Sequence, residues 1–328
     1  MRTAFVTGGS GFVGANLVRA LLAEGWSVRA LVRGAAPNLA GLPVELVPGD
    51  LFAPALAGAL HGCDALFHVA ALYSLARRDA AAVMHANVAG THAVLTAAKA
   101  AGVTRVVHTS SVAAIGVRAG GSPADESYQS PPQALVGAYK RSKYFAEEAV
   151  RAAVRGGLDV VIVNPSTPIG PWDRKPTPTG EIVVRFGTGR MPAYVETGLN
   201  VVDVRDVARG HLLAYERGKP GERYILGHEN LTLRALLERL APLVGRPAPR
   251  MRVPHAVALA YALAAQSVAW VRGVQPEVEV EAVRMSRQRM FYASAKATHD
   301  LGYVPGPLAP ALADAVTWFR EHGMLTPQ

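Results

Sequence analysis

Cysteine is nearly missing from this 328-residue sequence, which contains only Cys63. One thiol cannot build an internal disulfide framework or a thiolate-rich metal site. The ten histidines show no tight ligand spacing either. We therefore expect no metal ion, and we expect a reducing compartment, the cytoplasm.

Long apolar runs are also scarce. The apolar N-terminal residues meet a glycine cluster at Gly8 before a signal core can accumulate, which predicts no secretion signal. Residues 254–271 are nearly all apolar, but polar residues interrupt them and their length is marginal for spanning a membrane. Two interpretations stay open for this segment. It is a packed helix or a subunit contact, or it is an apolar lid over a hydrophobic substrate, with membrane contact at Arg250, Arg252 and Arg272.

Runs of basic residues are missing too, although 34 Lys+Arg against 25 Asp+Glu give a net charge of +9. Because the positive residues are scattered, we expect no nucleic-acid partner. The charge suits phosphorylated ligands or an anionic membrane surface, and it does not choose between them. With 50% hydrophobic and 18% charged residues the chain lies outside the range of disordered sequences, and its length allows a large α/β unit plus a smaller lobe.

Apolar β-branched runs alternate with alanine- and leucine-rich segments along the first half of the chain. Strands separated by helices cannot pair as hairpins, so this rhythm predicts an α/β protein with a doubly wound parallel sheet and helices on both faces. The alternating segments are residues 3–7, 16–24, 27–32, 55–60, 65–69, 87–101, 105–109, 139–155 and 160–164.

A glycine-rich turn joins the first predicted strand to the first predicted helix. Glycine permits a tight turn and the close approach of a pyrophosphate, and a helix N-terminus supplies amide donors and a positive dipole. We predict that a dinucleotide binds here; a glycine turn without a ligand is the alternative. The predicted contacts are Gly8, Ser10, Gly11, Phe12, Val13 and Gly14.

Prolines break the βα rhythm after Pro165, and later segments mix helices with short strands. We expect residues 1–165 to form a dinucleotide-binding Rossmann domain. A return segment at 200–218 is expected to rejoin its sheet through a strand at 201–204 and the following helix. Residues 166–199 and 219–328 are expected to form a smaller α/β lobe that binds the substrate.

The residue that closes the second predicted strand bears on the choice of cofactor. Arg33 stands where a carboxylate would bind the ribose hydroxyls and repel a 2′-phosphate, whereas a guanidinium pairs with that phosphate. This predicts NADP, with NAD as the alternative if Arg33 is a solvated surface residue. Asp50, followed by Leu51, is expected beside the adenine; a turn residue is the other interpretation.

Tyr139 and Lys143 lie four residues apart, on one face of a predicted helix. A phenol of pKa ~10 is a poor base at neutral pH, and a neighbouring ammonium favours its ionised form. We predict that Tyr139 exchanges a proton with a carbonyl or hydroxyl, while Lys143 tunes the phenol and holds the nicotinamide ribose. An ordinary exposed pair is the alternative.

Three hydroxyl residues end the predicted strand at 105–109, at the edge where doubly wound sheets bind their ligands. A hydroxyl there can donate to a substrate oxygen. We assign that role to Ser111, keep Ser110 as the alternative, and expect Thr109 beside the cofactor. With Tyr139 and Lys143 this set would support hydride chemistry through a nicotinamide.

Together these motifs resemble the extended short-chain dehydrogenase/reductase family, also called the NAD-dependent epimerase/dehydratase family. Further similar motifs lie at residues 64–71, 87–91, 164–171, 204–208 and 301–305. The resemblance implies additional cofactor contacts from Val69, Ala70, Ala71, Asn87, Pro165, Ser166 and Thr167.

Two subgroups of that family compete. Residues 28–33 and 109–111 resemble dihydroflavonol 4-reductase-like enzymes, which reduce carbonyls with NADPH. Residues 164–179 and 189–194 resemble hopanoid-associated sugar epimerases, which implies a nucleotide-sugar epimerase that retains its cofactor. The Asp-Glu pair of family dehydratases is replaced by Val112-Ala113, which argues against 4,6-dehydration.

A carbonyl reductase acting on a small-molecule substrate is the main prediction, because Arg33 favours NADPH. A sugar epimerase is the alternative, and a non-catalytic NADP-binding sensor is the third. The sequence leaves a homodimer open. In the epimerase a diphosphate would be anchored by basic residues that otherwise form a solvated rim: Arg190, Arg284, Arg287 and Arg289.

Overall fold

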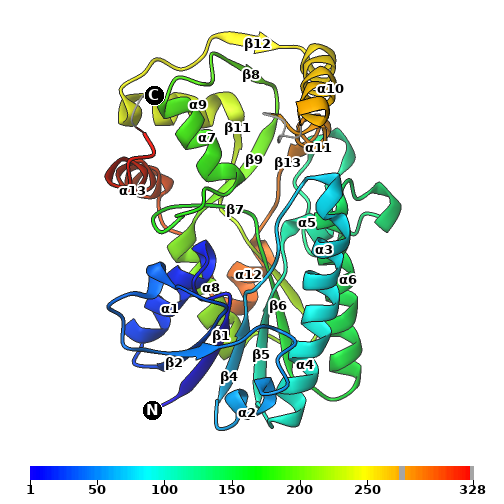
Figure 1. Ribbon diagram of the computed structural model, residues 1–328, viewed down its shortest axis with the longest axis vertical. Helices are drawn as coiled ribbons and strands as arrows, with labels where there is room; N and C mark the ends of the chain where they lie inside the picture. The colour runs from blue at the N-terminus through cyan, green and yellow to red at the C-terminus, as the bar shows by residue number, and fades with distance from the viewer. Residues whose placement is uncertain (273–277, 326–328) are drawn as a thin grey trace.

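In the computed structural model, which describes residues 1–272 and 278–325, a large sheet forms the lower part of the molecule and smaller sheets with helices form the upper part (Figure 1). The large sheet has seven parallel strands in the order β10-β6-β5-β4-β1-β2-β3, which confirms the predicted doubly wound fold. Its strands are β1 (Thr3–Thr7), β2 (Ser27–Val32), β3 (Val44–Pro48), β4 (Ala65–His68), β5 (Arg105–Thr109), β6 (Val160–Pro165) and β10 (Arg223–Leu226).

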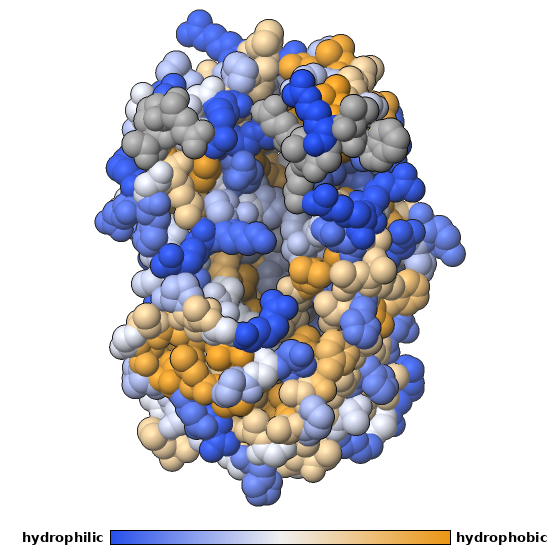
Figure 2. All heavy atoms as spheres, in the orientation of Figure 1, coloured by the Kyte–Doolittle hydropathy of each residue, from blue (hydrophilic) through white to orange (hydrophobic). Residues whose placement is uncertain are grey.

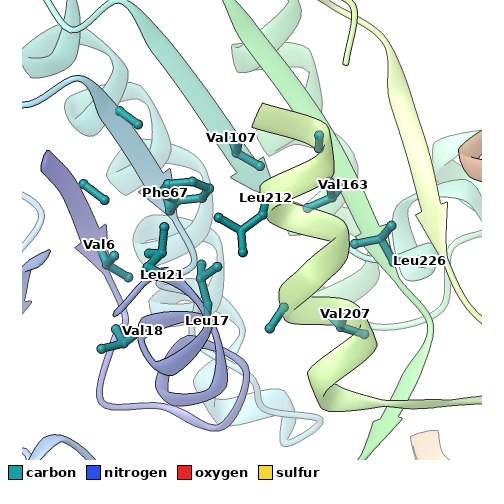
Figure 3. Close-up of a cluster of buried hydrophobic side chains, with 14 of the residues drawn as sticks. Val6, Leu17, Val18, Leu21, Phe67, Val107, Val163, Val207, Leu212 and Leu226 are labelled. Carbon is teal, nitrogen blue, oxygen red and sulfur yellow. The ribbon is translucent and has the colours of Figure 1, made fainter. Parts of the chain in front are cut away.

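Helices cover both faces of the large sheet. One face carries α1 (Phe12–Ala23) and α8 (Val204–Arg217), whose apolar side chains meet those of the strands (Figure 3). The other face carries α2 (Leu56–Leu60), α4 (Gly90–Ala100) and α6 (Ala138–Arg155). The shorter helices are α3 (Ala80–Met84), a π-helical turn (His85–Ala89), α5 (Val112–Ile115), α12 (Ala295–Leu301) and the 3₁₀ turns Pro37–Leu39, Arg77–Asp79, Ala119–Gly121 and Pro132–Ala134.

The central strand β6 shows why this sequence forms a sheet covered on both sides. All six of its residues are buried. Val161 and Val163 enter the core under α1 and α8, whereas Val160 and Ile162 enter the core under α4 and α6. A continuous apolar run is typical of a parallel strand between two helical layers, and each fully buried aliphatic side chain contributes about 1.5–3 kcal/mol.

The upper part contains two small sheets. One has the order β11-β9-β13 with β7 paired to β9, and the other pairs β12 with β8. Their strands are β7 (Thr167–Ile169), β8 (Ala193–Val195), β9 (Gly198–Asp203), β11 (Glu229–Thr232), β12 (Met251–Val253) and β13 (Arg289–Met290). The helices are α7 (Pro178–Gly187), α9 (Leu233–Val244), α10 (His255–Arg272), α11 (Val280–Met285) and α13 (Leu308–Glu321).

One predicted connection is wrong. Residues 201–204 do not rejoin the large sheet as a strand, because β9 pairs within the second sheet. The strand that extends the large sheet is β10, from the stretch assigned to the lobe. The guanidinium of Arg223 on β10 lies 3.3 Å from the buried carboxylate of Glu147 on α6. A buried carboxylate that lacks a positive partner destabilises a fold, so this ion pair helps to hold β10 in the sheet. The helix of the return segment, α8, does lie on the large sheet; the division into two domains stays a prediction.

Within the described ranges 1–272 and 278–325, none of the helices combines the length and the apolar character that crossing a membrane requires.

Candidate active site

The glycine turn between β1 and α1 is built for close approach of a ligand. Gly8 has a φ of +71°, and a Cβ there would lie 2.6 Å from the backbone nitrogen of Ala70. A Cβ at Gly14 would lie 2.1 Å from the carbonyl oxygen of Gly8. No side chain caps α1 at Gly11, so the first amides of the helix are available to an anion. Around the turn Ser10, Phe12 and Val13 are half-buried. These features fit the pyrophosphate of a dinucleotide.

Replacing Gly14 by alanine is expected to weaken binding of NADPH by at least roughly tenfold, because overpacking against the backbone of Gly8 costs about 1–3 kcal/mol and distorts the turn. Gly58→Ala is the matched control, since a Cβ at Gly58 meets nothing within 4 Å. Titration of NADPH fluorescence measures both. Unchanged affinity in Gly14→Ala would remove the turn from the account.

Arg33 lies at the carboxyl end of β2, beside the glycine turn, because β2 pairs in parallel with β1. Its side chain is exposed, and no carboxylate among the described residues pairs with it. Asp50 is exposed and accepts a hydrogen bond from the Phe52 amide at 2.8 Å, so it does form a turn. Leu51 is half-buried. Adenine contacts of Asp50 and Leu51 stay a prediction.

Tyr139 and Lys143 lie on one face of α6, at the carboxyl edge of the large sheet. The Lys143 ammonium donates to the carbonyl oxygen of Thr109 at 2.9 Å and is 3% exposed. The interaction of the Tyr139 hydroxyl with Ser111 lowers the pKa of the phenol, but burial outweighs it and raises that pKa. The structure therefore brings together Tyr139, Lys143, Ser111 and Thr109 at the carboxyl edge of the large sheet.

The two adjacent serines point to different partners. Ser111 caps α5, accepts from the Ala113 amide at 3.1 Å and meets Tyr139. Ser110 is 3% exposed and donates to the carboxylate of Glu147 at 2.6 Å. Of the two candidates, Ser111 is the one whose hydroxyl the structure places at the phenol.

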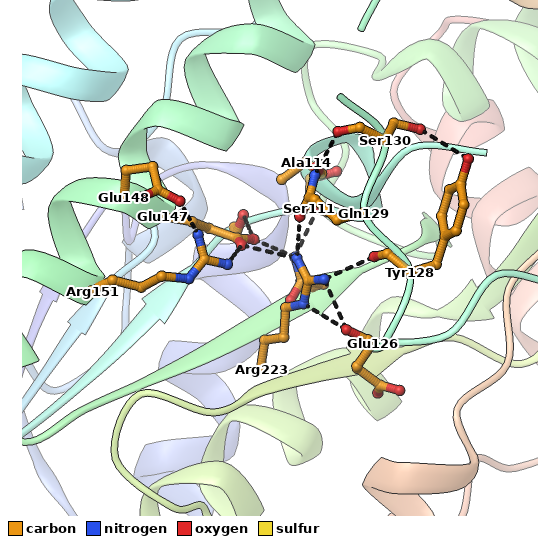
Figure 4. A network of polar contacts seen from close by, with 12 residues as sticks. Ser111, Ala114, Glu126, Tyr128, Gln129, Ser130, Glu147, Glu148, Arg151 and Arg223 are labelled. Atoms are coloured by element: carbon orange, nitrogen blue, oxygen red, sulfur yellow. Dashed lines mark hydrogen bonds and ion pairs between the residues drawn. The ribbon is translucent and has the colours of Figure 1, made fainter. Parts of the chain in front are cut away.

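A buried polar network behind these serines was missed at the sequence level (Figure 4). Its centre is Glu147, fully buried on α6, four residues after Lys143. Asn164 donates to Glu147 at 2.7 Å and to the carbonyl oxygen of Ser111 at 2.9 Å. Arg151 and Arg223 supply the balancing positive charges at 3.0 and 3.3 Å. The i+4 spacing from Lys143 was the one signal in the sequence, because it places a carboxylate on the face of α6 that carries the pair.

Two buried histidines near Lys143, His68 and His108, have lowered pKa values. His68 bonds Thr7 at 2.7 Å and Thr91 at 3.1 Å, and its ring lies 5.3 Å from that of His108. Burial lowers the pKa of His68 to about 3 and that of His108 well below its usual value. Burial also lowers the pKa of Lys143 to about 8, and Glu147 opposes this shift. The neutral imidazoles therefore leave Lys143 as the cation of the site.

The segment after β4 is held by Asn87. Its side chain accepts from the Leu72 amide at 2.7 Å and donates to the Leu72 carbonyl at 3.0 Å and to Ser142 at 2.8 Å. Asn87 is buried in the π-helical turn, a geometry that frequently marks functional sites. Asn87 thus fixes Leu72, the residue that follows the predicted contact residues Val69, Ala70 and Ala71. Of these three, Ala71 is exposed.

The segment after β6 is tied to the glycine turn by hydrogen bonds. Pro165 is buried, and Ser166 and Thr167 are half-buried at the start of β7. Further on, the Asn38 amide donates to the carbonyls of Ser10 and of Trp172, both at 3.1 Å. This bridge joins the glycine turn to the segment that follows Pro165.

No group of three or more His, Cys, Asp or Glu side chains that would suit a metal ion lies in the part of the chain that the structure describes.

The fold and this site define an NAD(P)-dependent oxidoreductase: a doubly wound sheet carries a glycine turn for a dinucleotide and a Ser-Tyr-Lys set at the same edge. The model of the NAD dependent epimerase/dehydratase family matches residues 4–227, and the chain belongs to that family. The resemblance predicted from the motifs is confirmed.

The similarity to known proteins extends over nearly the whole chain. It is 54% identical to the "Putative dihydroflavonol 4-reductase" of Synechocystis sp., covering 99% of this chain and 96% of that protein. It is 38% identical to "Sterol demethylase protein B" of Methylococcus capsulatus, covering 98% and 100%. Among solved structures it is similar to a nucleoside-diphosphate-sugar epimerase from Pseudomonas aeruginosa, with a TM-score of 0.83, 29% identity and 99% of each chain covered.

Proposed function

We propose that the protein is an NADPH-dependent carbonyl reductase. The observation that carries this proposal is the Tyr139 hydroxyl placed beside Ser111, on the face of α6 that carries Lys143, with desolvation that raises the pKa of the phenol. Reduction of a carbonyl needs a proton donor at neutral pH, whereas oxidation needs a base, so a raised pKa favours reduction. Bound NADPH would supply the hydride to the carbonyl carbon.

Each residue of the set then has one task. Ser111 donates to the carbonyl oxygen of the substrate and orients it. Tyr139 transfers its Oη proton to that oxygen, which leaves an alcohol and a tyrosinate that regains its proton from solvent. The Lys143 ammonium stabilises the tyrosinate and binds the nicotinamide ribose. Arg33 pairs with a 2′-phosphate, which is why NADPH is preferred to NADH.

The pH dependence of the reaction follows from Lys143. Its pKa of about 8 means that the ammonium is present at lower pH and is lost as the pH rises through that value. We expect kcat/KM for carbonyl reduction to be level below pH 8 and to fall above it. Glu147 supports the charged form, so Glu147→Gln should move this fall to lower pH.

Glu148→Gln is the matched control for that experiment, because Glu148 is the next residue on α6 but its side chain is 45% exposed and binds Arg151. Its profile should match the wild type. The glutamine at 147 still accepts from Ser110 and Asn164, and thermal unfolding reports whether the fold is kept. An unshifted profile in folded Glu147→Gln would refute the positioning role of Glu147.

We propose as the substrate site a cavity of about 660 Å³ at the start of α6, where Lys140, the residue after Tyr139, lines its wall. It lies between the start of α6 and the helices α10 and α11. Half of the ten residues that line it are apolar, which favours a bulky carbonyl compound with apolar parts. The similarity to the putative dihydroflavonol 4-reductase of Synechocystis sp. also supports a carbonyl substrate. The lining residues are Val136, Lys140, His255, Ala256, Leu259, Val283, Arg284, Met285, Arg287 and Gln288.

A nucleotide-sugar epimerase is the second candidate, favoured by the similar solved structure and by two arginines of the cavity. Arg284 and Arg287 would face a diphosphate there. The other two predicted anchors are engaged elsewhere, since Arg190 donates to Thr188 at 3.1 Å and Arg289 pairs with Glu196 at 3.9 Å. This weakens the diphosphate site and leaves the reductase as the better proposal.

Consumption of NADPH with a panel of aldehydes and ketones, beside product analysis of nucleotide sugars, separates these functions. The reductase oxidises NADPH with at least one bulky apolar carbonyl and leaves the sugars unchanged. Epimerised sugar without net NADPH consumption would overturn the proposal in favour of the second candidate, and no turnover of any kind would favour a sensor.

We also propose the cytoplasm as the compartment, because the free thiol of Cys63 is buried and a reducing environment preserves it. The homodimer stays a prediction.

A further inference from the structure

Helix α10 is apolar on the face that points away from the protein. The face toward the protein packs Ala262, fully buried, against α11. A surface helix ordinarily turns polar residues outward, so an apolar outer face indicates that something covers it. Figure 2 shows apolar atoms gathered at the upper right, where Figure 1 places α10. The outer apolar residues, with their exposed fractions, are Val257 (57%), Tyr261 (53%), Leu263 (46%) and Val268 (50%).

Exposed arginines frame this apolar face. Residues 246–289 contain seven arginines and three glutamates, and α10 itself has no acidic residue. Arg252 precedes the helix and Arg272 ends it, while Arg284 lies on the neighbouring α11. Among the described residues, no carboxylate pairs with the arginines of this frame, which are Arg250, Arg252, Arg272, Arg284 and Arg287.

We propose that this face, the outer side of α10 with its arginine frame, docks on an anionic lipid surface. An apolar helix side enters the boundary between headgroups and acyl chains, and the arginines at its rim bind lipid phosphates. A second copy fits less well, because a two-fold contact sets each patch against itself and would bring arginine against arginine. The inference goes beyond the proposed reduction and does not rest on it. His255, Ala256 and Leu259 of α10 also line the substrate cavity, so docking would bring that cavity to the lipid surface.

Co-sedimentation with vesicles tests the proposal, using phosphatidylcholine alone and phosphatidylcholine mixed with phosphatidylglycerol. The full chain should bind the mixed vesicles, lose affinity as salt rises, and bind the neutral vesicles much more weakly. Arg252→Gln with Arg272→Gln should weaken partitioning roughly 30-fold, because each arginine near an anionic surface raises the affinity roughly fivefold. Val257→Ser with Val268→Ser should weaken it roughly tenfold by removing apolar contact.

Two exposed residues elsewhere supply matched controls. Val304→Ser removes an apolar side chain that is 66% exposed, and Arg155→Gln removes a charge at the far end of α6. Both should bind as the wild type does, and NADPH binding verifies that each variant is folded. Absence of binding at low salt, or equal binding by the α10 variants and the wild type, overturns the proposal. Sedimentation that shows a dimer dissociated by Val257→Ser with Val268→Ser, without vesicle binding, also overturns it and assigns the face to a second copy.

Discussion

Replacing Tyr139 by phenylalanine is expected to lower kcat by about 10²–10⁴-fold while NADPH still binds with near-normal affinity. The phenylalanine keeps the ring, including its edge contact with Tyr73 at 4.6 Å between centroids, and removes only the hydroxyl. Without that hydroxyl the site loses its proton donor, because the Ser111 hydroxyl is too weak an acid to protonate the carbonyl oxygen in its place. Steady-state turnover and NADPH titration on the same preparation measure the two effects.

Tyr144→Phe is the control for this substitution, because Tyr144 lies on the same helix and stacks edge-on against Phe145, away from the pair. It should retain full turnover. If Tyr139→Phe kept activity within a few-fold of the wild type, the proton would have to come from another group and the assigned role would be wrong.

Arg33→Asp is expected to change the ratio of kcat/KM for NADPH to that for NADH by roughly 100-fold in favour of NADH. A charge-assisted hydrogen bond to phosphate contributes about 1.5–3 kcal/mol, and an aspartate both removes it and repels the phosphate. The same carboxylate can accept from the two hydroxyls of an NADH ribose. Because Arg33 is exposed and has no partner among the described residues, the fold should not depend on it.

The matched change of charge is Arg155→Asp, at the exposed end of α6 far from the glycine turn. It should leave the preference as it is, which separates a local contact from the effect of net charge. An unchanged ratio in Arg33→Asp would show that Arg33 does not select the cofactor. The cofactor preference would then no longer favour the reductase over the epimerase.

The large sheet and the glycine turn were predictable from sequence because both depend on local signals. Buried parallel strands are continuous apolar runs, as in β6, and a turn that opens a helix needs spaced glycines, as at Gly8 and Gly14. The spacing of Tyr139 and Lys143 likewise fixes them on one helical face whatever lies around them.

The rest depends on contacts between residues far apart in the chain. Nothing near residue 223 indicates that Arg223 meets Glu147, 76 residues earlier, and this pairing distinguishes β10 from β9 as the seventh strand. In the same way, Ser110 and Ser111 are equivalent in sequence until Glu147 binds one of them. Burial of Tyr139 raises its pKa, so the structure favours a proton donor where the Tyr/Lys spacing alone favoured an ionised phenol.

A crystal structure of the protein with bound NADP⁺ tests the central claim most directly. The account predicts the pyrophosphate on the amides at the start of α1, the 2′-phosphate on Arg33, and the Lys143 ammonium on the nicotinamide ribose. The hydroxyl of Tyr139 should face the hydride-carrying carbon across a space that one carbonyl group fills, with hydrogen bonds of about 3 Å. A nicotinamide ring turned away from Tyr139 and Lys143, or a dinucleotide bound elsewhere, would contradict the account.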